Sequence, residues 1–71
     1  MSNSVYKVIE LVGTSTESWE DAAKHAVEKA SKTLHDLRIA EVTKLDMRVE
    51  DDKVVAYRAR ISVSFKYSDE G

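Results

Sequence analysis

Residues 54–67 alternate apolar and polar side chains, and this long alternating segment constrains the fold more than any other feature of the sequence. Such alternation is typical of a β-strand with two unlike faces. The strand extends roughly 45 Å at about 3.3 Å per residue, whereas a helix over residues 18–34 spans only about 25 Å. One helix is therefore too short to cover the sheet, and the remaining apolar side chains are expected to contact another molecule.

The chain length allows one small domain, expected to span residues 1–71. A chain of this size buries only about 60% of its unfolded surface, so association with further copies of itself is expected. The chain has no cysteine, which excludes disulfides and thiolate metal sites. Its net charge of −2 argues against general attraction to nucleic acid or anionic membranes, and no apolar run is long enough to predict a membrane span. A cytoplasmic protein with no nucleic-acid or membrane partner is expected.

The sequence before the alternating segment predicts a strand followed by a helix. Residues 5–12 are rich in β-branched side chains and predict a strand that ends at the glycine after them. Ser18 and Asp21 have the spacing of a capping box, so a helix is expected to begin near Ser18. Thr14 and Glu17 are an alternative pair for the same role.

The predicted helix has one apolar face, because apolar residues recur at spacings of three and four. The alanines on this face predict close packing of the helix on the sheet. His25 and His35 lie on the same predicted helix but about 15 Å apart along it, too far to share a metal ion. The members of the apolar face are Trp19, Ala22, Ala23, Ala26, Val27, Ala30, Leu34 and Leu37.

Residues 37–49 predict a second strand, and the acidic segment 50–53 predicts a hairpin loop to the third. The loop lacks the Asn-Gly or Asp-Gly pair of the tightest turns. In the second strand Val42 breaks the apolar parity. Either Val42 faces the other side of the sheet, or a bulge lies near residues 43–44. The residues that share one parity are Ile39, Leu45, Met47 and Val49.

The sequence contains no arrangement that predicts catalysis. No serine has a local histidine and carboxylate partner, and neither a cysteine nucleophile nor a phosphate-binding glycine loop is present. Arg58, Arg60 and Lys66 form a basic row on the third strand, while the aromatic residues have the opposite parity. Ion pairs with Asp46, Glu10 or a neighbouring subunit are therefore expected in place of a nucleic-acid platform.

The segments VYKVIELVGTS at residues 5–15, KTL at residues 32–34 and VSFKY at residues 63–67 resemble the dodecins. The resemblance implies an α+β fold, βαββ, in which a three-stranded antiparallel sheet half-wraps one helix and copies assemble into a hollow homododecamer. It also implies a non-enzymatic storage protein for a flavin (FMN, riboflavin or FAD). In the family, tryptophans stack on the flavin at two-fold interfaces, and a glutamine on the last strand contacts the flavin edge.

Three positions of the implied flavin site differ from the family pattern. Ile39 replaces the stacking tryptophan, Asp46 replaces an arginine, and Arg58 replaces the glutamine. The chain thus resembles a tryptophan-less branch, in which flavin binding is weakened and an Asp46–Arg58 ion pair closes the pocket. Trp19, the single tryptophan, is expected to anchor the core, with ligand stacking as the alternative.

Two other functions stay open for an assembled shell. The first is binding of a divalent cation such as calcium, with Asp46, Glu50 and Asp52 as candidate ligands gathered at symmetry axes. Residues 50–52 lack the spacing and glycine of a calcium loop, so a solvated hairpin tip is the simpler interpretation. The second is a purely structural shell without a specific ligand.

Overall fold

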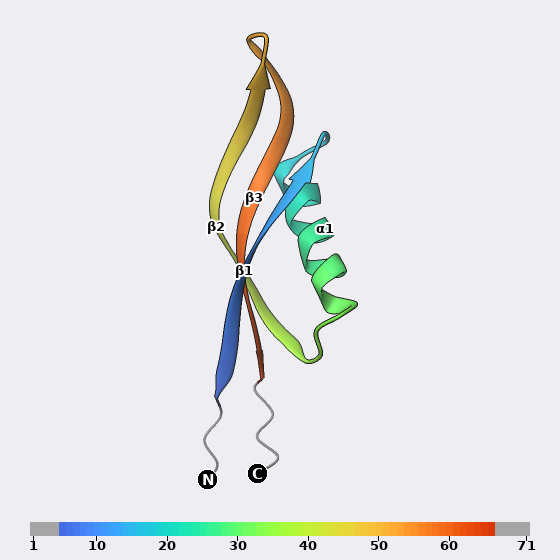
Figure 1. The fold of residues 1–71 in the computed structure, drawn as a ribbon, viewed down its shortest axis with the longest axis vertical. Coiled ribbons are helices and arrows are strands. Elements are labelled where there is room, and N and C mark those ends of the chain that lie inside the picture. Colours follow the sequence, from blue (N-terminus) through green and yellow to red (C-terminus); the bar gives the residue numbers. More distant parts are fainter. Residues whose placement is uncertain (1–4, 67–71) are drawn as a thin grey trace.

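The computed structural model describes residues 5–66 and shows one helix packed against a three-stranded antiparallel sheet (Figure 1). The strand order is β1-β3-β2, so the last strand in the sequence is the central one. This βαββ arrangement confirms the predicted fold. The elements are β1 (Tyr6–Ser15), α1 (Trp19–Ser31), β2 (Leu37–Glu50) and β3 (Lys53–Lys66).

Ser18 caps the N-terminus of α1, as its sequence predicts. Its backbone is extended, with φ −168° and ψ 166°, and its side-chain oxygen accepts a hydrogen bond from the backbone N–H of Asp21 at 3.0 Å. This bond satisfies one of the donors that the first helical turn leaves free. Ser18 is therefore the N-cap of α1, and the alternative pair of Thr14 and Glu17 does not cap the helix.

Strand β1 continues through Gly13, where the sequence analysis ended it. Gly13 is buried and pairs with Ala59 of the central strand. A Cβ atom at this position would collide with the carbonyl oxygen of Ala22 and would lie 2.9 Å from the Cβ of Ala26. The prediction was wrong because the glycine serves the close approach of β1 and α1 and does not end the strand.

Helix α1 ends at Ser31, earlier than the predicted end at Leu34. The chain then turns through Asp36, which has a positive φ of 62°. His35 consequently lies in the connection and not on the helix, and Leu37 begins β2 and packs against the core. The apolar spacing continued past the helix because Leu37 packs against the same core from β2. Of the part that the structure describes, no helix is long and apolar enough to span a membrane.

The core lies between α1 and β3. Its fully enclosed side chains are small or branched, and no charged or polar side chain of residues 5–66 is buried with them. Alanines on the helix allow it to lie close to the sheet, as predicted. The residues with 0% exposure are Ala22, Ala59, Ile61 and Val63.

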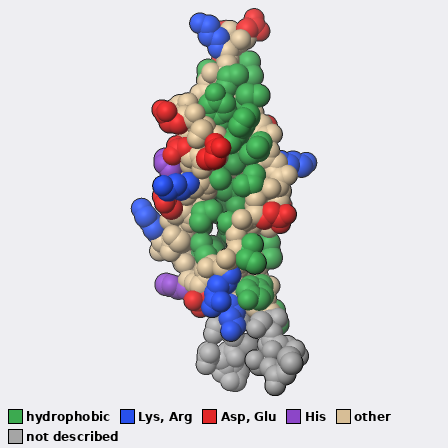
Figure 2. Space-filling view, turned by 180° about the vertical axis from the view of Figure 1, so that it is seen from behind, with side chains coloured by type: hydrophobic (Ala, Val, Ile, Leu, Met, Phe, Trp, Pro, Cys, Tyr) green, Lys and Arg blue, Asp and Glu red, His purple; other side chains and the backbone are tan. Residues whose placement is uncertain are grey.

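Strand β2 lies at the edge of the sheet and is exposed at every residue after Leu37. Helix α1 covers β1 and β3 and reaches β2 less. Figure 1 shows the hairpin of β2 and β3 projecting past the end of α1, as the predicted lengths required. Figure 2 shows a band of hydrophobic side chains running along one side of the molecule between charged groups.

A bulge in β2 decides which way its side chains face. The pairing with β3 shifts between Val42 and Lys44, which confirms the bulge predicted near residues 43–44. As a result Val42 and Leu45 both lie opposite buried residues of β3 and face α1. Ile39 lies opposite Ser64 on the other face. The alternative without a bulge, in which Val42 faces the other side and Ile39 and Leu45 share a face, is wrong, because the shift changes the parity between Ile39 and Leu45.

The hairpin turn is tighter than its sequence suggested. Glu50 pairs with Lys53, which leaves only Asp51 and Asp52 in the turn. Both have positive φ, 52° and 63°, as the two central residues of a type I′ turn require. Aspartate tolerates this left-handed conformation better than most non-glycine residues, so the tight turn forms without a glycine.

Candidate ligand site

The candidate ligand residues lie on the side of the sheet turned away from α1. We call this side the open face, and it includes the side chains of Glu10, Ile39, Asp46, Arg58 and Arg60. The odd-numbered core residues of β3 face α1, so the alternating even-numbered residues and their partners on β1 and β2 face the other way. The open face therefore carries these charged side chains together with exposed apolar ones, namely Val8, Val12 and Ile39.

Asp46 and Arg58 lie directly opposite each other on β2 and β3 and form an ion pair with two hydrogen bonds. Arg58 Nε donates to Asp46 Oδ1 at 2.7 Å, and Arg58 Nη2 donates to Asp46 Oδ2 at 2.9 Å. These hydrogen bonds are the main cause that holds the pKa of the Asp46 carboxyl below its usual 3.8, and they raise the pKa of Arg58. We call this pair the Asp46–Arg58 clamp. A ligand that needs either charged group must first open it.

The predicted ion pair between Arg60 and Glu10 is also present. Arg60 Nη1 lies 3.7 Å from Glu10 Oε1 across β3 and β1. Lys66 lies at the end of the same row. Two of the three basic side chains thus face carboxylates within the chain, and the row does not form a free positive platform.

Ile39 lies on the open face with 64% of its surface exposed. It is opposite Ser64, six residues along β3 from Arg58. Six residues of strand span about 20 Å, so one chain does not bring Ile39 next to the clamp. A small ligand that contacts all three candidate residues therefore needs more than one copy of the chain.

Trp19 lies on the α1 side of the sheet, opposite the clamp side chains. Its ring packs edge-on against Tyr57, with centroids 5.2 Å apart and planes at 70°. Its Nε1–H donates to the backbone oxygen of Asp46 at 3.0 Å. Trp19 therefore anchors the start of α1 to β2 and β3, and it does not face a ligand bound on the open face of the same chain.

The carboxylates proposed for calcium do not converge within one chain. Among residues 5–66 no group of three or more histidine, aspartate or glutamate side chains is placed to hold a metal ion. Both oxygens of Asp46 are bound by Arg58, and Glu50 Oε2 lies 3.6 Å from Arg48 Nη2. Asp52 lies at the hairpin tip. Asp46 and Glu50 are four strand residues apart, about 13 Å.

A polar concavity of about 400 Å³ borders the clamp where β1 ends. It combines Arg48 and Arg58 with three consecutive hydroxyl residues that the sequence analysis did not assign to a site. No local pattern marks them, because β3 brings the end of β1 and the middle of β2 together. The lining residues are Thr14, Ser15, Thr16, Arg48, Val55, Ala56 and Arg58.

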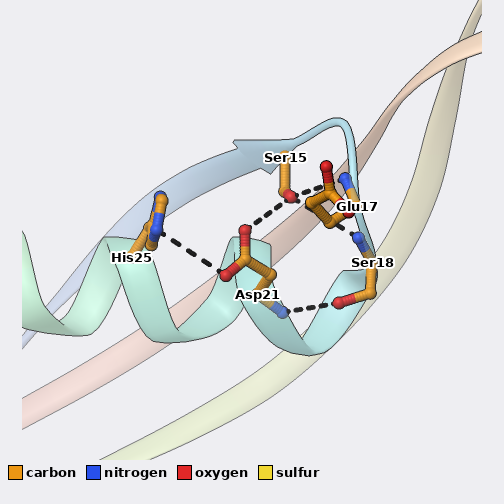
Figure 3. A network of polar contacts seen from close by, with 5 residues as sticks. All are labelled: Ser15, Glu17, Ser18, Asp21 and His25. Atoms are coloured by element: carbon orange, nitrogen blue, oxygen red, sulfur yellow. Dashed lines mark hydrogen bonds and ion pairs between the residues drawn. The ribbon is translucent and has the colours of Figure 1, made fainter.

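Ser15, Asp21 and His25 lie together at the start of α1 (Figure 3). Ser15 Oγ donates to Asp21 Oδ2 at 2.7 Å, and Asp21 Oδ1 lies 3.6 Å from His25 Nε2. These residues come together because the end of β1 folds back on the helix. The carboxylate lies between serine and histidine, and Ser15 Oγ also accepts a hydrogen bond from the Glu17 N–H at 2.8 Å. This arrangement stabilises the turn and is not that of a catalytic triad.

An apolar groove of about 340 Å³ separates α1 from β2 on the other side of the sheet. The buried Ile61 lines it together with Val27 and Val42. Two exposed charged residues of the helix, Lys24 and Glu28, also line it. Ala23 and Ala40 complete the lining.

Comparison with known proteins decides the family. The family model for dodecins matches residues 5–68. The chain belongs to the dodecin family. The calcium dodecin of Mycobacterium tuberculosis is 48% identical over 63 residues, which cover 89% of each chain. The dodecin of Thermus thermophilus is 37% identical over 65 residues, covering 92% of this chain and 94% of that one.

Solved dodecin structures share the fold. The dodecin of Streptomyces coelicolor superposes with a TM-score of 0.90 at 36% identity, covering 99% of this chain and 100% of that chain. The calcium dodecin of Mycobacterium tuberculosis, described as calcium-chelating with a novel calcium-binding site, gives a TM-score of 0.82 at 43% identity. That match covers 94% of this chain and 96% of the other. The resemblance found in the sequence is thereby confirmed.

Proposed function

We propose that this dodecin assembles into a hollow homododecamer that binds a small ligand and catalyses no reaction. The apolar surface of β2 supports the assembly, because an edge strand with exposed apolar side chains on both faces is best covered by another protein surface. The apolar groove between α1 and β2 adds to this surface, and a second copy is the occupant we propose for it. The exposed residues, each 46–64% accessible, are Ile39, Val42, Leu45, Met47 and Val49.

The Asp46–Arg58 clamp is the observation that carries the ligand proposal. Asp46 and Arg58 match two positions of the flavin site that the family resemblance implies, and each charged group is bound by the other instead of by a ligand. Ile39 offers no aromatic surface for stacking. An aromatic pair contributes about 0.5–1.5 kcal/mol beyond burial, so its loss lowers flavin affinity roughly two- to tenfold. The chain is thus a dodecin in which FMN, riboflavin or FAD binds weakly.

Calcium is the second candidate ligand, and the relative named calcium dodecin favours it. Calcium takes six to eight oxygen ligands. One chain does not gather them, so carboxylates from several copies are required. Glu50 and Asp52 are the best placed, because they lie on the hairpin that projects past α1 (Figure 1). Asp46 is available only where the clamp opens.

Native mass spectrometry on the purified, untreated protein tests assembly and ligand together. We expect a dodecamer, and the bound mass separates flavin-sized adducts from calcium ions. A monomer or dimer would contradict the assembly. A dodecamer without adducts, even after addition of FMN or calcium chloride, would leave a purely structural shell.

A set of substitutions separates the two ligands. Ile39→Trp, Asp46→Arg and Arg58→Gln together restore the family side chains, and flavin binding measured by quenching of flavin fluorescence is expected to strengthen at least tenfold. Arg60→Gln is the matched control, because it changes the neighbouring arginine on the same face. For calcium, Asp46→Ala, Glu50→Ala and Asp52→Ala are each titrated by calorimetry. Binding unchanged in all three would exclude these carboxylates as ligands.

A further inference from the structure

Trp19 connects the helix to the ligand site through the sheet, and we propose that it is the positioning residue of the Asp46–Arg58 clamp. Its indole N–H holds the main chain of Asp46 from the α1 side, while the Asp46 carboxylate meets Arg58 on the open face. The relevance of this positioning role to ligand binding rests on the proposed function, in which the clamp closes a ligand site.

The first support is how little else joins α1 to β2. Helix α1 contacts β2 less than it contacts β1 or β3. Among residues 5–66, the bond of 3.0 Å from Trp19 Nε1 to the Asp46 oxygen is the one side-chain hydrogen bond between helix and edge strand. β2 is also exposed around Asp46. The main chain at Asp46 is therefore fixed by β3 on one side and by this indole from the helix.

The second support is the place where the indole packs. Trp19 lies edge-on against Tyr57, the residue before Arg58, and Tyr57 pairs with Met47, the residue after Asp46. Neighbouring strand residues face opposite sides, so Tyr57 meets the indole on one face of the sheet while Arg58 meets Asp46 on the other. Movement of Arg58 therefore reaches Trp19 through the adjacent Tyr57, and movement of Asp46 reaches it through the Asp46 carbonyl.

The consequence is that the two faces of the sheet are coupled at this point. A ligand or substitution that opens the clamp removes the bond that orients the Asp46 side chain, and the Asp46 carbonyl then shifts against the indole. Trp19 is the only tryptophan in the chain, so its fluorescence and its indole N–H resonance report on this contact without interference.

The first experiment compares Arg58→Gln with Arg60→Gln in the full chain. Arg58→Gln removes the clamp, whereas Arg60→Gln removes the ion pair with Glu10 on the same face and the same strand. We expect Arg58→Gln to shift both the indole N–H resonance and the emission maximum of Trp19, and Arg60→Gln to leave both unchanged. No shift with Arg58→Gln, or equal shifts in the two variants, would overturn the proposal.

The second experiment runs in the opposite direction. Trp19→Phe keeps an aromatic ring against Tyr57 and removes the N–H donor. We expect the Arg58 Nε–H resonance to lose the shift that its bond to Asp46 produces, while far-ultraviolet circular dichroism stays unchanged. A folded variant with an unaltered Arg58 resonance would refute the positioning role, and if Trp19→Phe does not fold, the Arg58→Gln comparison decides alone. Neither experiment measures ligand binding, so their failure would leave the proposed function standing, and a chain that binds no flavin or calcium would leave the positioning role standing.

Discussion

Strands β2 and β3 have the same length, 14 residues, and pair along almost all of it, yet their burial is opposite. β3 carries Ala59, Ile61 and Val63 at 0% exposure, whereas β2 has no buried residue. The cause is the strand order, which places β3 in the centre under α1 and β2 at the edge beyond it. Alternating apolar residues in a sequence therefore indicate that one face of a strand is to be buried. They do not indicate whether the same chain or another copy buries it.

The largest effect that distinguishes the two strands is expected for Leu45→Asp. Leu45 is 51% exposed on the α1 side of β2, so the isolated chain tolerates a charge there. On assembly the carboxylate would lose its water without a partner, at a cost of several kcal/mol per copy. Native mass spectrometry should show loss of the dodecamer, with Leu45→Met as the control that keeps the apolar surface. A dodecamer formed by Leu45→Asp would show that Leu45 does not lie in an interface between copies of the chain.

Ile61→Ala tests the other strand. Its side chain is fully enclosed, so the substitution should lower the free energy of unfolding by about 2–5 kcal/mol at every protein concentration. Val42 lies opposite Ile61 and is 47% exposed. Val42→Ala should therefore cost less, and its cost should fall as the protein is diluted and the copies separate. Urea unfolding at several concentrations measures both, and equal costs in the dissociated chain would remove the distinction between the strands.

Local chemistry was predictable from the sequence wherever neighbouring residues decide it. Ser18 caps the helix because its hydroxyl oxygen is near the free N–H of the first turn, whatever else the chain does. The alternation of β3 and the parity break at Val42 likewise follow from the two-residue repeat of a strand. The pair of Asp46 and Arg58 was foreseeable once the two strands were known to be adjacent.

The errors concern features that distant parts of the chain decide. Gly13 was predicted to end a strand, but it is required by Ala22, which approaches it in space. His35 was placed on the helix because leucines continued the spacing into the next strand. The contact from Trp19 to Asp46 and the group of Ser15, Asp21 and His25 leave no trace in local spacing, since tertiary packing creates them.

The hairpin tip offers a smaller and stabilising test. Replacing Asp51 and Asp52 by Asn-Gly puts the preferred type I′ residues at the two positive-φ positions. The relief of left-handed strain should raise the free energy of unfolding by about 0.5–1 kcal/mol. Thermal unfolding measures it, with Asp51→Asn alone as the control that leaves Asp52 strained. An unchanged stability would mean that the turn is not under strain. If the Asn-Gly variant also binds calcium as the wild type does, Asp52 is not a calcium ligand.

The smallest expected effect is the pH dependence of the Asp46–Arg58 clamp, which joins the exposed strand to the buried one. The folded-state pKa of Asp46 lies below the usual 3.8, mainly because Arg58 donates hydrogen bonds to the carboxylate. The clamp therefore stabilises the fold fully at pH values above 3.8, and this contribution is lost as the pH falls through the lower folded-state pKa. Asp46→Asn does not titrate, so its urea midpoint should fall less steeply in acid than that of the wild type, whereas Glu10→Gln serves as the control on the same face. The difference should be small and should shrink with added salt, because the two side chains are 42% and 53% exposed. Identical acid slopes for the wild type and Asp46→Asn would mean that the clamp adds nothing to the stability of the fold in solution.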